Sequence, residues 1–326
     1  MDERLLAHLK ATPERYRSGE ELAEALGITR AAIWKQIETL RAHGYEIEAQ
    51  PHLGYKLMRI PDRLLNVEIH SGLRTQTFGR TLQCFNETDS TMDVAHRLAK
   101  AGAAEGTAVF AETQRAGRGR LGRAWASPPL AGIYGSLIVR PTLSLQALST
   151  LTLTMAIGLA RAIEDETTLP IKIKWPNDLM FHDAKVGGIL TELQAEQDRI
   201  QYVVVGFGIN VNGAPAQLPP GATSLQQALG RPVHRVPLIR RLLEASELVY
   251  MQLLREGFAT LQQEWRARST VLGHRIRLTS QPPSPGQPPR ELEGQAVDID
   301  EAGALVVRRD SGLQERLTAG DVVKLW

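Results

Sequence analysis

The sequence predicts an α+β multidomain protein with a winged helix-turn-helix over residues 1–62, a central mixed-sheet α/β domain over 63–271 and a small β-barrel over 272–326. Three changes of pattern predict this order. Two helical segments and a ribbon come first, strand-like and helix-like segments alternate from about residue 80, and short alternating strands follow Gly273. A chain of 326 residues is long enough for two or three domains with buried cores.

The first 60 residues carry the start and stop signals of successive helices. A first helix is expected from its apolar residues Leu5, Leu6 and Leu9. Ser18 is placed to cap the helix GEELAEAL, with Glu21 at the capping-box position, and Gly27 ends that helix. Thr29 is placed to cap the next helix, whose apolar residues Ile33, Ile37 and Leu40 share one face. The segments YEIEA and GYKLM then form a two-stranded ribbon, which completes a winged helix-turn-helix pattern.

The charge distribution of this segment favours DNA binding over its alternative, a helical protein-interaction module. Nine Lys/Arg stand against nine Asp/Glu in residues 1–60, so the total decides nothing. Acidic residues crowd the helix GEELAEAL. The helix after Thr29 carries instead Arg30, Lys35 and Arg41 against only Glu38. A basic exposed helix face suits the phosphate backbone and the major groove of DNA.

The rest of the chain predicts a catalytic-size domain followed by a small β domain. Residues 60–74, IPDRLLNVEIHSGLR, are expected to form a linker. Expected strands are TAVFAETQ, GIYGSLIVR, IKIKW, VGGILTELQ and YVVVGFGINV, and expected helices are STMDVAHRLAKAG, with a Ser/Thr cap, and LTLTMAIGLARAI. Beyond Gly273 the expected strands are RIRLTS, ELEGQAVDID, GALVVRRD and QERLTAGDVVKLW. Five prolines in QPPSPGQPPR forbid ladder pairing and predict an exposed loop there.

Composition narrows the class of protein. Hydrophobic residues make up 43% and charged residues 23%, as in a globular protein with a buried core. The net charge of +2 is uninformative, so any anion-binding role must come from local clusters of charge. No run approaches the ~18 apolar residues of a membrane span. The N-terminus lacks a signal-peptide core. Cys84 is the only cysteine, so disulfides and cysteine-based metal clusters are excluded; it is expected to be a small core residue in a protein of the reducing cytoplasm.

Residues 115–123, RAGRGRLGR, hold four arginines and three glycines and match G-x-G-x-x-G. A dinucleotide fingerprint would need a helix after the glycines and an acid about 20 residues later. Here Pro128-Pro129 follow, and no acid lies between Gln114 and Glu164. A P-loop and a kinase loop fail because their partner motifs are missing, and an RNA-binding tract would be longer and repeated. Glycines and arginines at a strand end instead predict a loop that folds over an anionic ligand.

Three further motifs follow strands. KWPNDLMF places Lys174, Trp175, Asn177 and Asp178 around a proline turn, which is either ordinary turn chemistry or the edge of a ligand pocket. AKVGGILTE puts Lys185 before two glycines, where the plain alternative is a surface lysine. GFGIN ends an apolar strand with glycines that allow a ligand close to the backbone.

Taken in order, FNETDSTMD, ETQRAGRGRLGRAW, KWPNDL, KVGGILTE and GFGIN resemble the motifs of biotin–protein ligases. The segment SGEELAEALGITRAAIWKQIETLRAHGYEIEAQPHLGYKL resembles the winged helix of the bifunctional type, which also represses biotin-synthesis genes. The resemblance implies a class II synthetase-like ligase domain, an SH3-like C-terminal barrel and a two-step reaction with ATP, Mg²⁺ and biotin. Biotin's carboxylate attacks the α-phosphate of ATP, and a lysine of the biotin carboxyl carrier protein, a subunit of acetyl-CoA carboxylase, then attacks the biotinyl-5′-AMP.

The resemblance also implies roles for individual residues. Catalysis is expected from Lys185, Arg118 and Arg120, with Lys185 as the main electrostatic stabiliser. The residues expected to bind biotin are Ser90, Thr91, Met92, Gln114, Gly117, Arg118, Gly119, Arg120, Lys185, Gly188 and Gly208. The residues expected to bind the nucleotide are Arg118, Arg120, Arg123, Trp125, Asn177, Asp178 and Asn210, with Asp178 also the candidate Mg²⁺ ligand.

Partners follow from the same resemblance. It implies a homodimer that forms through the central sheet once the adenylate is made and that binds a two-part operator, with Thr29, Arg30, Trp34 and Lys35 facing the DNA. The alternatives are a lipoate–protein ligase and a regulator that senses a ligand without ligase activity. The segment NGAPAQLPPGATSLQQALGRPVHR and the proline loop 281–289 match no expected pattern, which leaves the dimer and acceptor contacts open.

Overall fold

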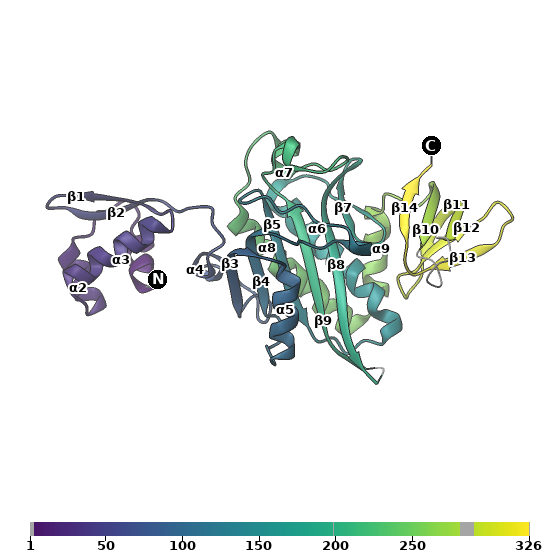
Figure 1. Cartoon of the computed structure of the whole chain (residues 1–326), viewed down its shortest axis with the longest axis horizontal. Coiled ribbons are helices and arrows are strands. Elements are labelled where there is room, and N and C mark those ends of the chain that lie inside the picture. Colours follow the sequence, from purple (N-terminus) through teal and green to yellow (C-terminus); the bar gives the residue numbers. More distant parts are fainter. Residues whose placement is uncertain (1–2, 198, 281–289, 326) are drawn as a thin grey trace. The chain divides into compact units, whose positions relative to one another are not determined.

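The computed structural model describes residues 3–197, 199–280 and 290–325, and it separates into two compact units, Met1–Arg63 and Leu64–Trp326 (Figure 1). The boundary falls inside the stretch expected to be a linker. Only its first part connects the units, because residues 66–70 form helix α4 (Asn66–His70), in which Glu68 and Ile69 are buried. Burial of these two side chains makes α4 part of the second unit, so the expectation of a linker over 60–74 is wrong in its second half.

The N-terminal unit has the predicted winged helix-turn-helix. Its elements are α1 (Glu3–Ala11), α2 (Gly19–Leu26), α3 (Arg30–Ala42), β1 (Glu46–Gln50) and β2 (Gly54–Arg59). Ser18 Oγ accepts the Glu21 N–H at 3.0 Å and Thr29 Oγ1 accepts the Ala32 N–H at 3.2 Å, so both predicted caps are present. The Glu21 carboxylate bonds to Arg17 at 2.7 Å. Strands β1 and β2 pair antiparallel as the wing.

A seven-stranded mixed sheet forms the centre of the second unit, in the order β3-β4-β5-β9-β8-β7-β6. The strands are β3 (Leu82–Thr88), β4 (Ala108–Gln114), β5 (Gly132–Val139), β6 (Lys172–Lys174), β7 (Asp178–Phe181), β8 (Ala184–Glu196) and β9 (Arg199–Asn210). Only β3 and β4 run parallel to each other; the other neighbours are antiparallel. The long hairpin of β8 and β9 forms the middle of this sheet (Figure 1).

Helices cover both faces of the sheet because its strands are apolar on both sides. Val109 of β4 packs with α5 (Thr91–Lys100), whereas the next residue, Phe110, belongs to the larger core on the other face. That core includes α6 (Leu148–Thr167), α8 (Arg235–Glu256) and α9 (Ala259–Arg268). Shorter elements are α7 (Leu225–Leu229), η1 (Arg120–Gly122), η2 (Leu145–Ala147) and η3 (Pro215–Gln217). No helix of the described residues is long and apolar enough to cross a membrane.

The C-terminal segment forms the small β domain that was predicted. Strands β10 (Arg275–Ser280), β11 (Arg290–Ile299), β12 (Leu305–Arg308), β13 (Gln314–Leu317) and β14 (Asp321–Lys324) make an antiparallel sheet in the order β13-β12-β11-β10-β14. The stretch QERLTAGDVVKLW, expected to be one strand, is two, because Gly320 turns the chain between β13 and β14 with φ at 150°. The proline loop 281–289 lies outside the described residues.

Candidate active site

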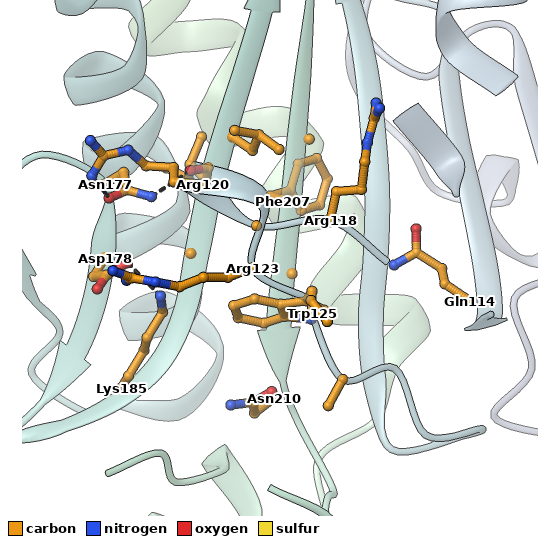
Figure 2. Close-up of a pocket in the computed structure, with 18 of the residues that line it drawn as sticks. Gln114, Arg118, Arg120, Arg123, Trp125, Asn177, Asp178, Lys185, Phe207 and Asn210 are labelled. Carbon is orange, nitrogen blue, oxygen red and sulfur yellow. Dashed lines mark hydrogen bonds and ion pairs between the residues drawn. The ribbon is translucent and has the colours of Figure 1, made fainter. Parts of the chain in front are cut away.

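A cavity of about 370 Å³ lies over strands β8 and β9, at the edge where β4 ends (Figure 2). Residues of α5, β4, β7, β8 and β9 line it together with the loop after β4. A volume of this size is typical of sites for small ligands. We call residues 115–126 the arginine-glycine loop.

The arginine-glycine loop is folded back on itself beside the cavity. The Gly119 N–H donates to Arg123 O at 2.7 Å, and the Trp125 N–H donates to Gly117 O at 2.8 Å. The indole of Trp125 then lies flat against β9. A Cβ atom added at Gly208 would stand 2.5 Å from Trp125 Nε1 and 2.6 Å from Cζ2, so only glycine leaves room for the ring. The structure gives this reason for a glycine in the motif GFGIN.

Three cationic side chains gather on one side of the cavity: Arg120, Arg123 and Lys185 (Figure 2). Arg120 Nη1 donates to Asn177 Oδ1 at 3.2 Å and to Gly320 O at 3.3 Å. Burial lowers the pKa of Arg120, and Asp321 of β14, 3.7 Å away, opposes this shift. The Asp321 carboxylate also pairs with Arg123, so the C-terminal domain supplies an acid that orients both arginines.

Lys185 is held in place by an acid and a ring. Its Nζ lies 2.6 Å from Asp178 Oδ1 and 5.3 Å from the centre of the Trp125 ring. Both side chains of the ion pair are partly accessible from the cavity, at 33% for Lys185 and 23% for Asp178. The motifs KWPNDL and KVGGILTE therefore meet at one point, because β7 and β8 pair antiparallel with Asp178 opposite Gly188.

Polar groups form the other end of the cavity. Gln114 Oε1 accepts the Thr91 N–H at 2.9 Å, and Gln114 Nε2 donates to Ser127 Oγ at 2.9 Å. Ser90 is the N-cap residue of α5, but its hydroxyl makes no capping bond, contrary to the predicted Ser/Thr cap. Ser90 Oγ and Trp125 Nε1 are buried without a hydrogen-bond partner among the described residues. Such groups are costly unless something pairs with them, so both atoms point to a polar ligand.

Arg118 lies apart from the other cations. Its side chain is directed away from Arg120 and Lys185, although it borders the cavity (Figure 2). Its Nη2 atom lies 3.1 Å from Asp93 Oδ1 on α5 and 3.0 Å from Glu192 Oε2 on β8.

The structure brings most of the expected site residues to this one cavity. Those that line it are Ser90, Thr91, Met92, Gln114, Arg118, Gly119, Arg120, Arg123, Trp125, Asn177, Asp178, Lys185, Gly188, Gly208 and Asn210. Gly117 stands behind them, where an added Cβ would press on Trp125 O at 2.6 Å. Sequence reasoning missed Phe207, Pro219, Pro220, Ala222 and Asp321, which also line the cavity. The unmatched segment around Pro219-Pro220 reaches the site because the Lys185 N–H donates to Gly221 O and Lys185 O accepts from Thr223.

The structure also shows the surroundings of Cys84 and of the residues expected to face DNA. Cys84 is packed against the core, and burial raises the pKa of its thiol to about 12, which suits a core residue rather than a nucleophile. In the N-terminal unit, Thr29, Arg30, Trp34 and Lys35 are exposed at the start of α3, and Trp34 is 59% accessible.

Comparisons with known proteins identify the family. Profiles match the Biotin/lipoate A/B protein ligase family over residues 84–210, an HTH domain over 2–56 and the Biotin protein ligase C terminal domain over 286–325. Over 306 residues, 93% of this chain and 92% of the relative, the chain is 38% identical to the Bifunctional ligase/repressor BirA of Bacillus subtilis. The chain belongs to the bifunctional biotin ligase and repressor family.

Further members of this family, and a solved structure, match over most of the chain. The Bifunctional ligase/repressor BirA of Escherichia coli is 34% identical over 302 residues, which are 90% of this chain and 89% of that protein. The solved structure of biotin protein ligase from Aquifex aeolicus in complex with biotin and ATP matches with a TM-score of 0.63 at 27% identity, covering 76% of this chain and 99% of that one. The biotin ligase family thus accounts for the fold around the cavity.

Proposed function

We propose that this protein activates biotin with ATP to biotinyl-5′-AMP and transfers the biotinyl group to a lysine of the biotin carboxyl carrier protein. The observation that carries the proposal is the composition of the cavity. Two buried, unpaired polar atoms, Ser90 Oγ and Trp125 Nε1, share it with Arg120 and Lys185. A ligand with a neutral polar head and a carboxylate to be joined to a nucleotide fits this distribution of donors and cations.

In the first step the biotin carboxylate oxygen attacks the α-phosphorus, and the bond between this phosphorus and the bridging oxygen breaks, releasing pyrophosphate. Both reactants are anions, so fixed cations are the main contribution the protein can make. Arg120 is preoriented by Asn177 and the Gly320 carbonyl, and Lys185 by Asp178. We assign the carboxylate and α-phosphate to these two cations, and the adenylate side of the cavity to Trp125, Asn177, Asp178, Asn210 and Arg123. We assign the biotin head to Ser90, Thr91, Met92, Gln114 and Gly188; Gly208, which the resemblance also assigns to biotin, is covered by the Trp125 ring.

Mg²⁺ fits this site as a companion of ATP. No group of three or more His, Cys, Asp or Glu in the described parts of the chain could hold a metal ion by itself. Mg²⁺ at nucleotide sites uses one or two carboxylates together with phosphate oxygens, and Asp178 lines the cavity as such a carboxylate. When bound there, it would neutralise charge on the triphosphate.

In the second step the lysine amine of the carrier protein attacks the acyl carbon, the bond to AMP breaks and the amine loses a proton to solvent. The mixed anhydride must be protected from water until then. The arginine-glycine loop, whose Gly117 and Gly119 allow it to lie close over the cavity, is suited to this role.

We further propose that the winged helix binds operator DNA through Thr29, Arg30, Trp34 and Lys35, and that the protein dimerises through its central sheet when the adenylate is bound. Two copies would present two recognition helices to a two-part operator. The exposure of these four residues supports the DNA contact.

One experiment separates the candidate functions. The protein is incubated with ATP, Mg²⁺ and either biotin or lipoate, and acyl-AMP is measured by mass spectrometry. Biotinyl-AMP alone is expected. Lipoyl-AMP alone would make the protein a lipoate ligase, and no adenylate with either acid would leave only a ligand-sensing regulator.

A further inference from the structure

A chain of polar side chains joins the arginine-glycine loop to α5 and β8 and has no part in the reaction just described. Arg118 Nη2 contacts Asp93 Oδ1 at 3.1 Å and Glu192 Oε2 at 3.0 Å. The same Glu192 oxygen lies 3.0 Å from His96 Nε2, and His96 Nδ1 lies 3.3 Å from the hydroxyl of Tyr202, a residue 2% exposed. Glu192 of β8 is thus also held by His96 of α5, which is itself bonded to Tyr202 of β9.

The backbone explains why Arg118 faces this chain. Gly119 is extended, with φ at −115° and ψ at −177°. Successive side chains of an extended segment point to opposite sides, so the neighbours of Gly119 on either side would share a direction in a straight strand. The loop turns directly after Gly119, into η1. This turn directs Arg120 into the cavity, whereas the Arg118 side chain at the cavity border points away from it (Figure 2). Arg118 is therefore free to serve as a tether.

We propose that Glu192, assisted by Asp93, is a positioning residue that clamps Arg118 and so holds the arginine-glycine loop closed over the acyl-adenylate. The inference rests on the proposed function. Each carboxylate comes from a regular element, β8 or α5. Arg120 and Arg123 tie the loop to the β7 and β14 side of the cavity, and Arg118 adds the ion pairs that join it to α5 and β8. The clamp governs how long the adenylate is retained. It leaves the chemical step to Arg120 and Lys185.

The test uses the full chain with Glu192→Gln, which keeps the size of the side chain and removes its charge. Adenylate is formed from labelled biotin and ATP, unlabelled biotin is added, and the escape of labelled biotinyl-AMP into solution is followed. We expect escape to be about fivefold faster, which corresponds to about 1 kcal/mol, the upper range for a partly exposed ion pair. The rate of adenylate formation should stay within about twofold. Glu196→Gln on the same strand, whose carboxylate contacts Gln201 and not the loop, is the matched control.

A double-mutant cycle and a ligand-free measurement complete the test. In an Arg118→Met background, Glu192→Gln should have no further effect on escape, because its partner is gone. Without any ligand, trypsin should cleave after Arg120 and Arg123 faster in Glu192→Gln than in the Glu196→Gln control. Unchanged escape and unchanged cleavage, additive effects in the cycle, or an equal loss in adenylate formation would each overturn the clamp. A wild-type chain that forms no biotinyl-AMP would instead overturn the proposed function, and the cleavage rates would still decide the clamp.

Discussion

Adding one methyl group at residue 208 tests how the cavity is built. In the structure the Trp125 indole lies against the glycine backbone of β9. The new Cβ of Gly208→Ala would stand 2.5 Å from Nε1 and 2.6 Å from Cζ2, whereas ordinary contacts begin near 3.4 Å. The ring must therefore retreat by roughly 1 Å, and the backbone of a central strand cannot yield in its place.

We expect the displacement of the Trp125 ring to weaken biotin binding more than it lowers the free energy of unfolding. Overpacking costs about 1–3 kcal/mol in a closed core. Trp125, however, lies on a loop and not on a strand of the sheet, so we expect the loop and not the global fold to take up most of the strain. The closed loop then becomes the less favourable state, and biotin binding should weaken by about tenfold to a hundredfold, equivalent to about 1.4–2.8 kcal/mol.

Titration calorimetry with biotin measures this loss, and thermal unfolding checks the fold. In a Trp125→Ala background the penalty of Gly208→Ala should vanish. A penalty that persists there would refute the reasoning, since the methyl would then obstruct the ligand itself.

Three further predictions concern catalysis and stability. Lys185→Met should slow biotinyl-AMP formation by about 10²–10³, the usual effect of removing a fixed electrostatic donor, whereas Trp34→Ala should weaken DNA binding and leave adenylate formation intact. Glu112→Gln should lower the free energy of unfolding, measured with urea, by about 3–5 kcal/mol, because it breaks a buried ion pair in which Arg235, 1% exposed, lies 2.6 Å from the Glu112 carboxylate. Burial tends to raise the pKa of the Glu264 carboxyl. Arg161 of α6 and Arg268 of α9 outweigh this effect, so the pKa of Glu264 lies below its ordinary value. Its stabilising effect should therefore be full above about pH 5 and fade as the pH falls below about 4, so Glu264→Gln should destabilise the fold at neutral pH and not in acid.

Each of these predictions has an outcome that would contradict it. Equal losses of adenylate formation in Lys185→Met and Trp34→Ala would contradict separate roles for the two units. A Glu112→Gln variant as stable as the wild type would mean that Arg235 finds other compensation. A Glu264→Gln penalty that is the same at pH 3 and pH 7 would show that the charge of Glu264 is not what stabilises the fold.

The elements that local signals dictate could be predicted from the sequence. Ser18 and Thr29 cap helices because each side chain accepts a hydrogen bond from the backbone N–H three residues later. This contact lies within one short segment and does not depend on the tertiary fold. Strands β8 and β9 follow from their apolar runs, which are typical of buried strands. These signals placed the motifs at the ends of strands, whereas the pairing of β7 with β8, which brings Asp178 to Lys185, came only from the structure.

The missed residues act across large sequence separations. Asp321 reaches Arg120 and Arg123 from a strand about 200 residues away, and nothing in the segment TAGDVVKLW marks it as part of a site. Glu112 looks like one more polar residue of β4, yet it meets Arg235 of α8 in the core. Long-range ion pairs depend on which carboxylate the fold places nearby, and periodicity carries no information about that choice.

Two arginines of the loop, Arg118 and Arg120, show that the sequence also fails to distinguish residues that stand close together in the chain. Arg118 and Arg120 have the same chemistry and flank the same glycine, so the sequence assigns both to the anionic ligand. In the structure Arg118 finds Asp93 and Glu192 outside the loop, and Arg120 finds Asn177 at the cavity. A guanidinium already paired with two carboxylates has less attraction to offer a phosphate than one bonded mainly to neutral oxygens. The surroundings thus distinguish two arginines of the same chemistry, and the clamp that we propose for Arg118 rests on this difference.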